Sequence, residues 1–291
     1  MPTPSRYRRR VGVLLMPGRT VGTANTITQE NVDWFSTRGV EVIPIPHDTP
    51  SPDYYVNHVD GLYFQGGGTD DATYYATCQR LLTAAVAANN AGRFFPVWGT
   101  CHGFLALMII VGGLDRPLPE FDAYNSYMAE IAWTKAAPRS RLYHGLAPEF
   151  RRHVTTPRAV FFNNEHGVSP VAFAANRHLA AFFKPLAVAA DRRGRRFIAA
   201  IEARRYPFFG VQFHPERSPT MSPFCEFFVE QLMRTRGRRA PIDARHRLLG
   251  TRHRHRGPYA SKRFNQLYTR KACRGRWSRL FPPAGCYYFK G

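Results

Sequence analysis

The sequence lacks the marks of several protein classes. Its five cysteines form no Cys-x-x-Cys pair and no regular framework, so neither a disulfide scaffold nor a zinc site is indicated. The longest apolar run, residues 104–111, is far too short to cross a bilayer. No Asn-x-Ser/Thr acceptor occurs, which disfavours a glycosylated secreted protein. The basic N-terminus is followed by a short apolar run that ends at Pro17 without a small-residue cleavage site, so no secretory signal is visible.

Acidic residues are scarce and unevenly distributed. The 291 residues include 41 Lys and Arg against 20 Asp and Glu, a formal net charge of +21. Residues 1–233 hold 24 Lys and Arg with 19 acids, whereas residues 234–291 hold 17 Lys and Arg with one acid. The excess positive charge therefore belongs to a C-terminal extension. We divide the chain into a basic segment at 1–10, one domain at 11–237 and an Arg-rich extension at 238–291.

The extension at 238–291 has two interpretations. Arginines dominate it, and Tyr259, Tyr268 and Trp277 are interleaved with them. Such a segment can neutralise phosphates, so nucleic acid or another polyanion is one partner hypothesis, with an affinity that falls steeply in salt. The alternative is a solvated extension whose arginine content reflects compositional bias.

Short apolar runs alternate with helical patterns in the first 113 residues. We predict strands over 11–16, 40–45, 59–64 and 94–98, with a loop rich in Pro and Asp after the second strand. We predict helices over 24–39, 72–92 and 102–113, the second capped by Asp70 or Asp71. Continuous apolar strands that alternate with helices are typical of a parallel α/β sheet.

The second half of the domain is less regular up to about residue 165. Residues 158–170 predict a strand that leads into a turn, and residues 179–216 predict successive strands with a hairpin around "DRRG". Residues 222–237 predict a closing amphipathic helix. Its expected inward face consists of apolar side chains, namely Phe224, Phe227, Phe228, Leu232 and Met233.

The stretch "GTCHG" places Cys101 between glycines at the end of a predicted strand and the start of a predicted helix. This pattern has the shape of a nucleophile elbow, in which flanking glycines allow a sharp turn. A helix N-terminus also lowers the pKa of a thiol, and the thiolate is the form that attacks. The alternative is a small buried hydrophobe, because free cysteine is among the most buried residue types.

The stretch "QFHPE" places His214 and Glu216 two residues apart. On an extended segment such side chains point to the same side, and Pro215 restricts φ between them. A carboxylate beside an imidazole holds its tautomer and stabilises the imidazolium, as in a catalytic triad. The alternative is a surface ion pair.

These motifs resemble the class I glutamine amidotransferase-like superfamily and, within it, the gamma-glutamyl hydrolase family. The resemblance covers about residues 11–236, with an echo in "CYYF" at 286–289. The stretches that carry it are "GVLLMPGR", "VDGLYFQGGGTD", "FFPVWGTCHGF", "SRLYHGLAPEF", "NNEHGVSP", "YPFFGVQFHPE" and "EFFVEQ". It implies a flavodoxin-like, mostly parallel sheet flanked by helices, with the basic extension added.

The resemblance also implies a Cys101–His214–Glu216 triad that cleaves gamma-glutamyl bonds, typically those of folate or antifolate poly-gamma-glutamates, without metal or cofactor. The relatives are typically secreted, lysosomal or vacuolar, which leaves the compartment of this chain undecided. A small gamma-glutamyl substrate and a homodimer are the partners expected from the family, and no membrane span is expected.

Four further residues are expected at this site. The backbone N–H groups of Gly67 and His102 are expected to stabilise the oxyanion. His166 and Gly66 are expected at the substrate site, because His166 falls where the family has a histidine. A hydrogen-bonded turn histidine is the alternative for His166.

Two positions depart from the family pattern. Gln65 replaces the usual proline before the glycines, and Leu105 replaces a polar residue that contacts the glutamyl part of the substrate. Because leucine cannot make that contact, another group supplies it, or specificity has shifted, or activity is reduced. Two alternative functions therefore stay open: a glutaminase subunit that supplies ammonia, and a weakly active homologue that binds partners through its basic extension.

Overall fold

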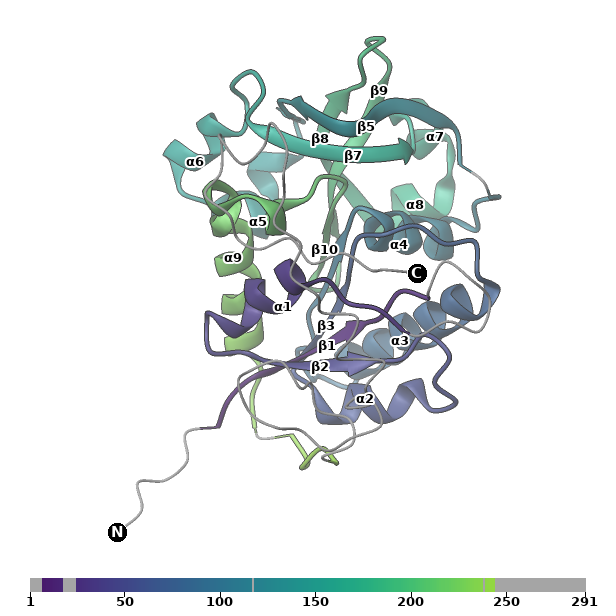
Figure 1. Cartoon of the computed structure of the whole chain (residues 1–291), viewed down its shortest axis with the longest axis vertical. Coiled ribbons are helices and arrows are strands. Elements are labelled where there is room, and N and C mark those ends of the chain that lie inside the picture. Colours follow the sequence, from purple (N-terminus) through teal and green to yellow (C-terminus); the bar gives the residue numbers. More distant parts are fainter. Residues whose placement is uncertain (1–6, 18–24, 117, 238, 244–291) are drawn as a thin grey trace.

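The computed structural model describes residues 7–17, 25–116, 118–237 and 239–243. Its centre is an eight-stranded sheet in the order β2-β1-β3-β4-β10-β9-β8-β6 (Figure 1). The strands are β1 (Arg10–Leu14), β2 (Glu41–Ile45), β3 (Gly61–Phe64), β4 (Val97–Thr100), β6 (Ala132–Trp133), β8 (Phe183–Ala190), β9 (Arg196–Ala203) and β10 (Phe208–Val211). The first five strands in this order are parallel, and the remaining pairs are antiparallel. The predicted mostly parallel sheet is confirmed.

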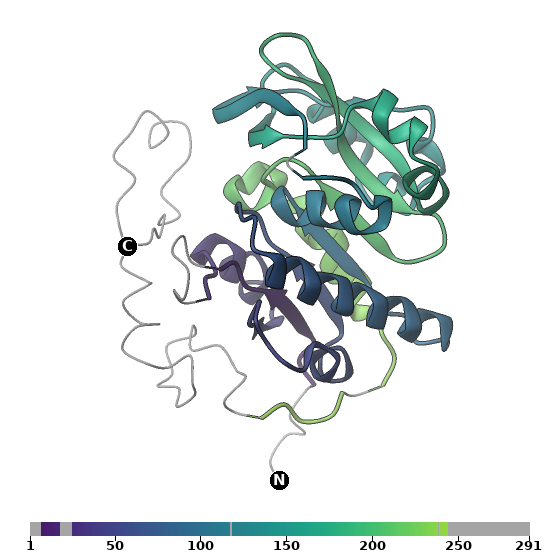
Figure 2. The same ribbon diagram turned by 90° about the vertical axis from the view of Figure 1, so that its right-hand side faces the viewer.

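Helices cover both faces of this sheet. One face carries α1 (Gln29–Ser36), α5 (Arg141–His144), α6 (Pro148–His153) and α9 (Ser222–Met233). The other carries α2 (Pro52–His58), α3 (Ala72–Asn90), α4 (His102–Gly112), α7 (Pro170–Ala175) and α8 (Arg177–Phe182). Figure 2 shows α3 and α4 side by side in front of the sheet. A separate antiparallel pair, β5 (Glu120–Ala129) and β7 (Val160–His166), lies beyond the ends of the central strands.

The apolar core has two layers because successive strand residues point to opposite faces. Trp98 of β4 packs into the layer that contains α1 and α9, whereas its neighbour Val97 packs into the layer that contains α2, α3 and α4. Phe209 and Phe208 of β10 divide in the same way. This two-sided burial explains why the strands are apolar without alternation.

Several sequence predictions need correction in detail. The loop expected after the second strand contains α2, which begins with Pro52 at its first turn, a position that proline tolerates. β4 runs from Val97 to Thr100 instead of 94–98, because pairing with β3 and β10 begins at Val97. Met233 was expected to face inward but is 49% exposed at the end of α9. The hairpin around "DRRG" is confirmed by the β8–β9 pair.

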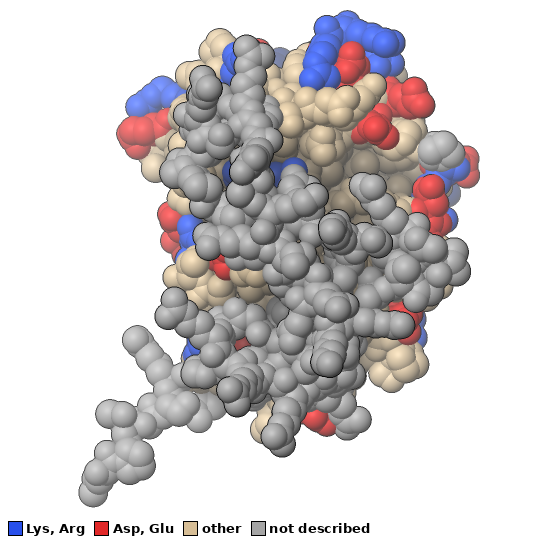
Figure 3. Space-filling view, viewed as in Figure 1, with Lys and Arg blue, Asp and Glu red and all other residues tan. Residues whose placement is uncertain are grey.

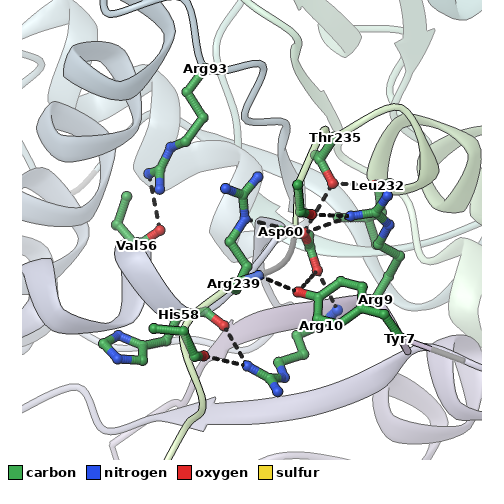
Figure 4. Close-up of polar contacts among 12 residues, drawn as sticks. Tyr7, Arg9, Arg10, Val56, His58, Asp60, Arg93, Leu232, Thr235 and Arg239 are labelled. Atoms are coloured by element: carbon green, nitrogen blue, oxygen red, sulfur yellow. Dashed lines mark hydrogen bonds and ion pairs between the residues drawn. The ribbon is translucent and has the colours of Figure 1, made fainter. Parts of the chain in front are cut away.

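A buried carboxylate joins the two ends of the described chain (Figure 4). Asp60, which precedes β3, is fully buried and has donors from segments that are far apart in the sequence. These donors, all within 3.2 Å, are Tyr7 Oη, Arg9 Nη1, Arg10 N, Thr235 Oγ1 and Arg239 Nε. The two carboxylate oxygens of Asp60 therefore hold the segment around the start of β1 and the segment after α9 together.

Residues 239–243 also pack on the domain. Arg10 Nη1 donates to the carbonyl of Ala240 at 2.8 Å, and Ile242 is 4% exposed within the apolar layer around α2. The contacts of the domain thus continue beyond the predicted boundary at 237. The rest of the extension, 244–291 with its "CYYF", lies outside the described residues, as does most of the segment 1–10.

Charges of both signs lie close together on the described surface. The described residues include 25 Lys and Arg and all 20 Asp and Glu. Figure 3 shows basic and acidic side chains beside one another around the edge of one face. Among the described residues, no helix combines the length and the apolar character that a bilayer crossing needs.

The Asp60 cluster predicts a large effect of charge removal on stability. Asp60→Asn keeps the shape of the side chain but leaves Arg9 and Arg239, which are 18% and 9% exposed, without their carboxylate. Removing the charge of one partner in a buried ion pair lowers the free energy of unfolding by about 3 kcal/mol or more. The control is Asp53→Asn, which breaks an exposed pair with Arg80 and is expected to cost less than about 1 kcal/mol. Equal urea midpoints for the two variants would contradict this assignment.

Candidate active site

Cys101 occupies the sharp turn between β4 and α4. Its backbone has φ 49° and ψ −105°, a conformation that non-glycine residues rarely adopt. The Cys101 N–H donates to Val211 O at 2.8 Å, and its carbonyl accepts the N–H of Leu105 at 3.0 Å. The last strand and the first turn of the helix therefore hold this strained residue between them.

The turn requires glycine both before and after Cys101, at positions 99 and 103. A Cβ on Gly103 would collide with the carbonyl oxygen of Phe64 in β3, and a Cβ on Gly99 would lie 2.8 Å from the backbone carbon of Gly103. The Gly103 N–H also donates to Gln65 O at 3.1 Å. α4 thus starts in direct backbone contact with the segment that follows β3.

His214 and Glu216 form a buried pair after the end of β10, with His214 directly before η2 (Pro215–Arg217) and Glu216 within it. Nδ1 of His214 lies 2.7 Å from Oε1 of Glu216, and the two side chains are 5% and 3% exposed. Burial by itself lowers the pKa of His214, but its electrostatic interactions with Cys101 and Glu216 outweigh that effect and raise the pKa to about 9. Burial opposes ionisation of Glu216, yet the contact with His214 holds its pKa below the usual range.

Gly66 lies where Cys101 and His214 meet. A Cβ on Gly66 would be 2.8 Å from Cε1 of His214 and 3.4 Å from Cβ of Cys101. The structure therefore brings the predicted nucleophile, the predicted base and Gly66 to one place. Nε2 of His214 and Oε2 of Glu216 are buried and have no hydrogen-bond partner among the described residues.

The other described cysteines show what a merely buried thiol looks like here. Cys78 and Cys225 are both fully buried, and burial raises the pKa of each thiol. Cys225 donates to Trp34 O at 2.7 Å, so its thiol is held as a hydrogen-bond donor. Cys101 differs because an imidazole faces it and its backbone is strained.

His102 and Gly67 follow directly on two residues of this site, His102 on Cys101 and Gly67 on Gly66. The N–H of His102 is the first of α4, so it has no acceptor within the helix and lies at the positive end of the helix dipole. Gly67 lies against Met16, whose Cε would be 2.8 Å from a Cβ built there. Their role at an oxyanion stays a prediction.

The ring of His102 is buried between two tyrosines. Its Nε2 lies 3.2 Å from Tyr75 Oη, and the Tyr74 ring centroid is 5.5 Å away. Burial lowers the pKa of His102 to about 4, so its ring is neutral near pH 7. Its side chain therefore serves packing and hydrogen bonding at neutral pH.

His166 ends strand β7, and Phe161 of the same strand packs on the His214 ring with centroids 5.8 Å apart. His166 also interacts electrostatically with His102, so β7 borders the site from His214 to the start of α4. Nδ1 of His166 is buried without a partner among the described residues. This position fits the expected substrate-site histidine, which stays a prediction.

The two departures from the family pattern have distinct environments. The Gln65 amide donates to the carbonyls of Leu14 and Thr26, at 3.1 and 2.7 Å, and accepts from Asn31. Gln65 therefore fastens the loop before the glycines. Leu105 is 6% exposed within the apolar layer around α3 and α4, so it offers no polar contact.

Sequence reasoning missed Tyr75 and Arg116. The Arg116 guanidinium lies over the Tyr75 ring, 3.9 Å from its centroid, on the α3 side of His102. Neither residue belongs to a motif, so only the fold reveals them. The part of the chain that the structure describes contains no group of three or more His, Cys, Asp or Glu side chains that could hold a metal ion.

Several known proteins are similar to this chain in sequence. The family described as Glutamine amidotransferase class-I matches residues 23–230. Gamma-glutamyl hydrolase 1 of Arabidopsis thaliana is 29% identical over 227 residues, 75% of this chain and 65% of that protein. Gamma-glutamyl hydrolase of Homo sapiens is 26% identical over 217 residues, 72% of this chain and 67% of that protein. The chain thus spans about two thirds of the length of these relatives.

A solved structure shares the fold. The putative GMP synthase protein of Thermoplasma acidophilum superposes with a TM-score of 0.52 and 13% identity, covering 79% of this chain and 96% of that one. At this identity the likeness concerns the fold alone.

The contact between Gly103 and β3 predicts that this glycine is irreplaceable. Gly103→Ala would push α4 away from the Phe64 carbonyl, and such overpacking costs about 3 kcal/mol of the free energy of unfolding. Gly68→Ala is the matched control, because a Cβ there meets nothing within 4 Å. We expect Gly68→Ala to change stability by less than about 0.5 kcal/mol in urea unfolding. Similar stabilities of the two variants would show that the turn tolerates a side chain.

Proposed function

This chain belongs to the glutamine amidotransferase class-I family, and we propose that it hydrolyses gamma-glutamyl bonds with Cys101 as nucleophile. The observation that carries the proposal is the buried His214–Glu216 pair, 2.7 Å apart, facing a cysteine on a strained strand-to-helix turn. The names of the relatives, gamma-glutamyl hydrolases from a plant and from human, support the same bond as the target.

In the proposed reaction the Cys101 thiolate attacks the gamma-carbonyl carbon of a glutamyl residue, and the carbon–nitrogen bond breaks. His214 gives its proton to the leaving amine, which departs and leaves a thioester on Cys101. His214 then takes a proton from water, which attacks the thioester and releases the gamma-carboxylate and the thiolate. The raised pKa of His214 keeps the needed proton on the imidazole at neutral pH.

Two backbone donors are proposed for the oxyanion of the tetrahedral intermediates. The His102 N–H lies at the start of α4, directly after the nucleophile, and the Gly67 N–H belongs to the loop after β3. A preorganised donor of this kind typically contributes about 10²–10³ in rate. Glu216 acts through His214, since its contact fixes which imidazole nitrogen faces Cys101.

The proposed substrates are folate or antifolate poly-gamma-glutamates. A glutaminase subunit that supplies ammonia is the competing function within the same family, and free glutamine as substrate distinguishes it. The third hypothesis, a weakly active protein that binds nucleic acid or another polyanion, depends on residues 238–291, most of which lie outside the described part of the chain. The homodimer stays a proposal.

Loss of the nucleophile tests the reaction directly. Cys101→Ser replaces a thiolate by a neutral hydroxyl, so turnover of a pteroyl poly-gamma-glutamate is expected to fall by about 10³-fold or more. His214→Asn is expected to act similarly. The matched control is Cys225→Ser, which exchanges another buried thiol whose hydrogen bond to Trp34 O a hydroxyl can keep. Substantial turnover by Cys101→Ser, or release of ammonia from glutamine as the faster reaction of the wild type, would refute the proposal.

The charge of Glu216 predicts a shift in the pH profile. His214 must be protonated to protonate the leaving amine, so kcat/KM is expected to fall as pH rises through about 9. Glu216 is one of the charges that raise the pKa of His214, so Glu216→Gln lowers that pKa and moves the alkaline limb to lower pH. The maximal rate should fall less than in His214→Asn, since the base remains. An alkaline limb at the same pH in both proteins would show that Glu216 does not act through His214.

A further inference from the structure

Arg116 is joined to the candidate active site by a short series of contacts. Its guanidinium lies 3.9 Å from the centroid of the Tyr75 ring, and its Nη1 contacts the carbonyl of Asp70 at 3.5 Å. Tyr75 Oη in turn lies 3.2 Å from Nε2 of His102, the residue after Cys101. Arg116 therefore stands where the loop after β3 and the start of α4 come together.

The positive charge of Arg116 is available for a ligand. Arg116 is exposed, and no carboxylate of the described residues forms an ion pair with it. By contrast, Arg80, Arg141, Arg192 and Arg195 each have a carboxylate partner within 3.2 Å. The charge of Arg116 also reaches His102, whose pKa it lowers in addition to the larger effect of burial. A guanidinium stacked on an aromatic ring is restrained in position, and its five N–H donors exceed the one contact that Nη1 makes with Asp70 O.

The proposed substrate carries an anionic group that a guanidinium can bind. Whatever is attached to its amino nitrogen, a gamma-linked glutamyl residue has a free alpha-carboxylate on its alpha-carbon, which two methylene groups separate from the carbonyl that the nucleophile attacks. Leu105, one helical turn after Cys101, lies in an apolar layer and cannot contact a charged group. A partner for the alpha-carboxylate therefore has to come from elsewhere around the site, and a guanidinium is well suited to it.

We propose that Arg116, stacked on Tyr75 beside His102, binds the alpha-carboxylate of the glutamyl residue whose gamma-carbonyl Cys101 attacks. This inference rests on the proposed gamma-glutamyl hydrolysis and assigns a substrate-binding residue to it. The planar guanidinium fits a carboxylate with two parallel hydrogen bonds, which point-charge cations do not provide. The stack on Tyr75 fixes the position of the guanidinium relative to the first turn of α4.

The test compares two substrates in two enzymes. One substrate is pteroyl-gamma-diglutamate, and the other is the same compound with a carboxamide in place of the alpha-carboxylate of the attacked glutamyl residue. A charged hydrogen bond of this kind corresponds to about 10- to 100-fold in binding, so we expect wild-type kcat/KM to be lower for the amide by that factor. In Arg116→Gln we expect the two substrates to differ by less than about threefold, with the loss mainly in KM.

Two control variants separate recognition from structure. Arg205→Gln removes another exposed arginine that lies over a tyrosine, Tyr206 at 5.9 Å, at the opposite end of β10 from His214, and should keep the wild-type preference. Tyr75→Phe keeps the ring under Arg116 but removes the hydroxyl that contacts His102, so its preference for the carboxylate should also persist.

The outcomes distinguish this inference from the function on which it rests. If Arg116→Gln still prefers the carboxylate by the wild-type factor, the assignment of Arg116 is wrong and gamma-glutamyl hydrolysis stands. If the wild type cleaves neither substrate, the proposed function fails and the inference falls with it. If Arg116→Gln and Arg205→Gln lose the preference alike, the preference depends on the net positive charge of the protein and not on a contact with Arg116, and the assignment is again wrong.

Discussion

The close approach of the backbone around Gly103 is the constraint on which the rest of this structure depends. The start of α4 touches the carbonyl of Phe64 without room for a side chain, and this contact joins the Cys101 turn to β3. It also leaves Cys101 in a strained conformation, held by hydrogen bonds to Val211 on one side and Leu105 on the other.

Two buried carboxylates lie at opposite ends of the same sheet and differ in how fully they are hydrogen-bonded. Asp60 lies at the N-terminal end of β3 and accepts hydrogen bonds from one backbone N–H and four side chains, so it is saturated and structural. Glu216 lies beyond the C-terminal end of β10, where one of its oxygens, like Nε2 of His214, has no partner among the described residues. Unsatisfied buried polar atoms are costly, and they are tolerated where a reaction or a ligand uses them.

The sequence allowed much of this arrangement to be predicted, because the strongest signals are local. The glycines around Cys101 predict a sharp turn, and the spacing of His214 and Glu216 predicts a contact between their side chains. The structure shows both the turn and the contact. Helix α2 was missed because its proline-rich stretch is typical of a loop, whereas burial of Tyr55 and Val56 in the tertiary structure stabilises it as a helix. The exposure of Met233 was missed because helical periodicity does not reveal where a helix leaves the domain.

By itself the sequence determined which residues are candidates for the proposed chemistry and which local turn carries each of them, since residue type, glycine placement and the apolar pattern act within a few positions along the chain. Only the tertiary structure decided what surrounds them: that Gln65 fastens a loop, that Leu105 joins the core, and that Arg116 stands over Tyr75 beside the nucleophile helix. Arg116 comes from the connection after α4 and Tyr75 from the first turn of α3, so no local pattern links them. Their contact arises from the packing of α3 against α4, which depends on the whole sheet beneath both helices.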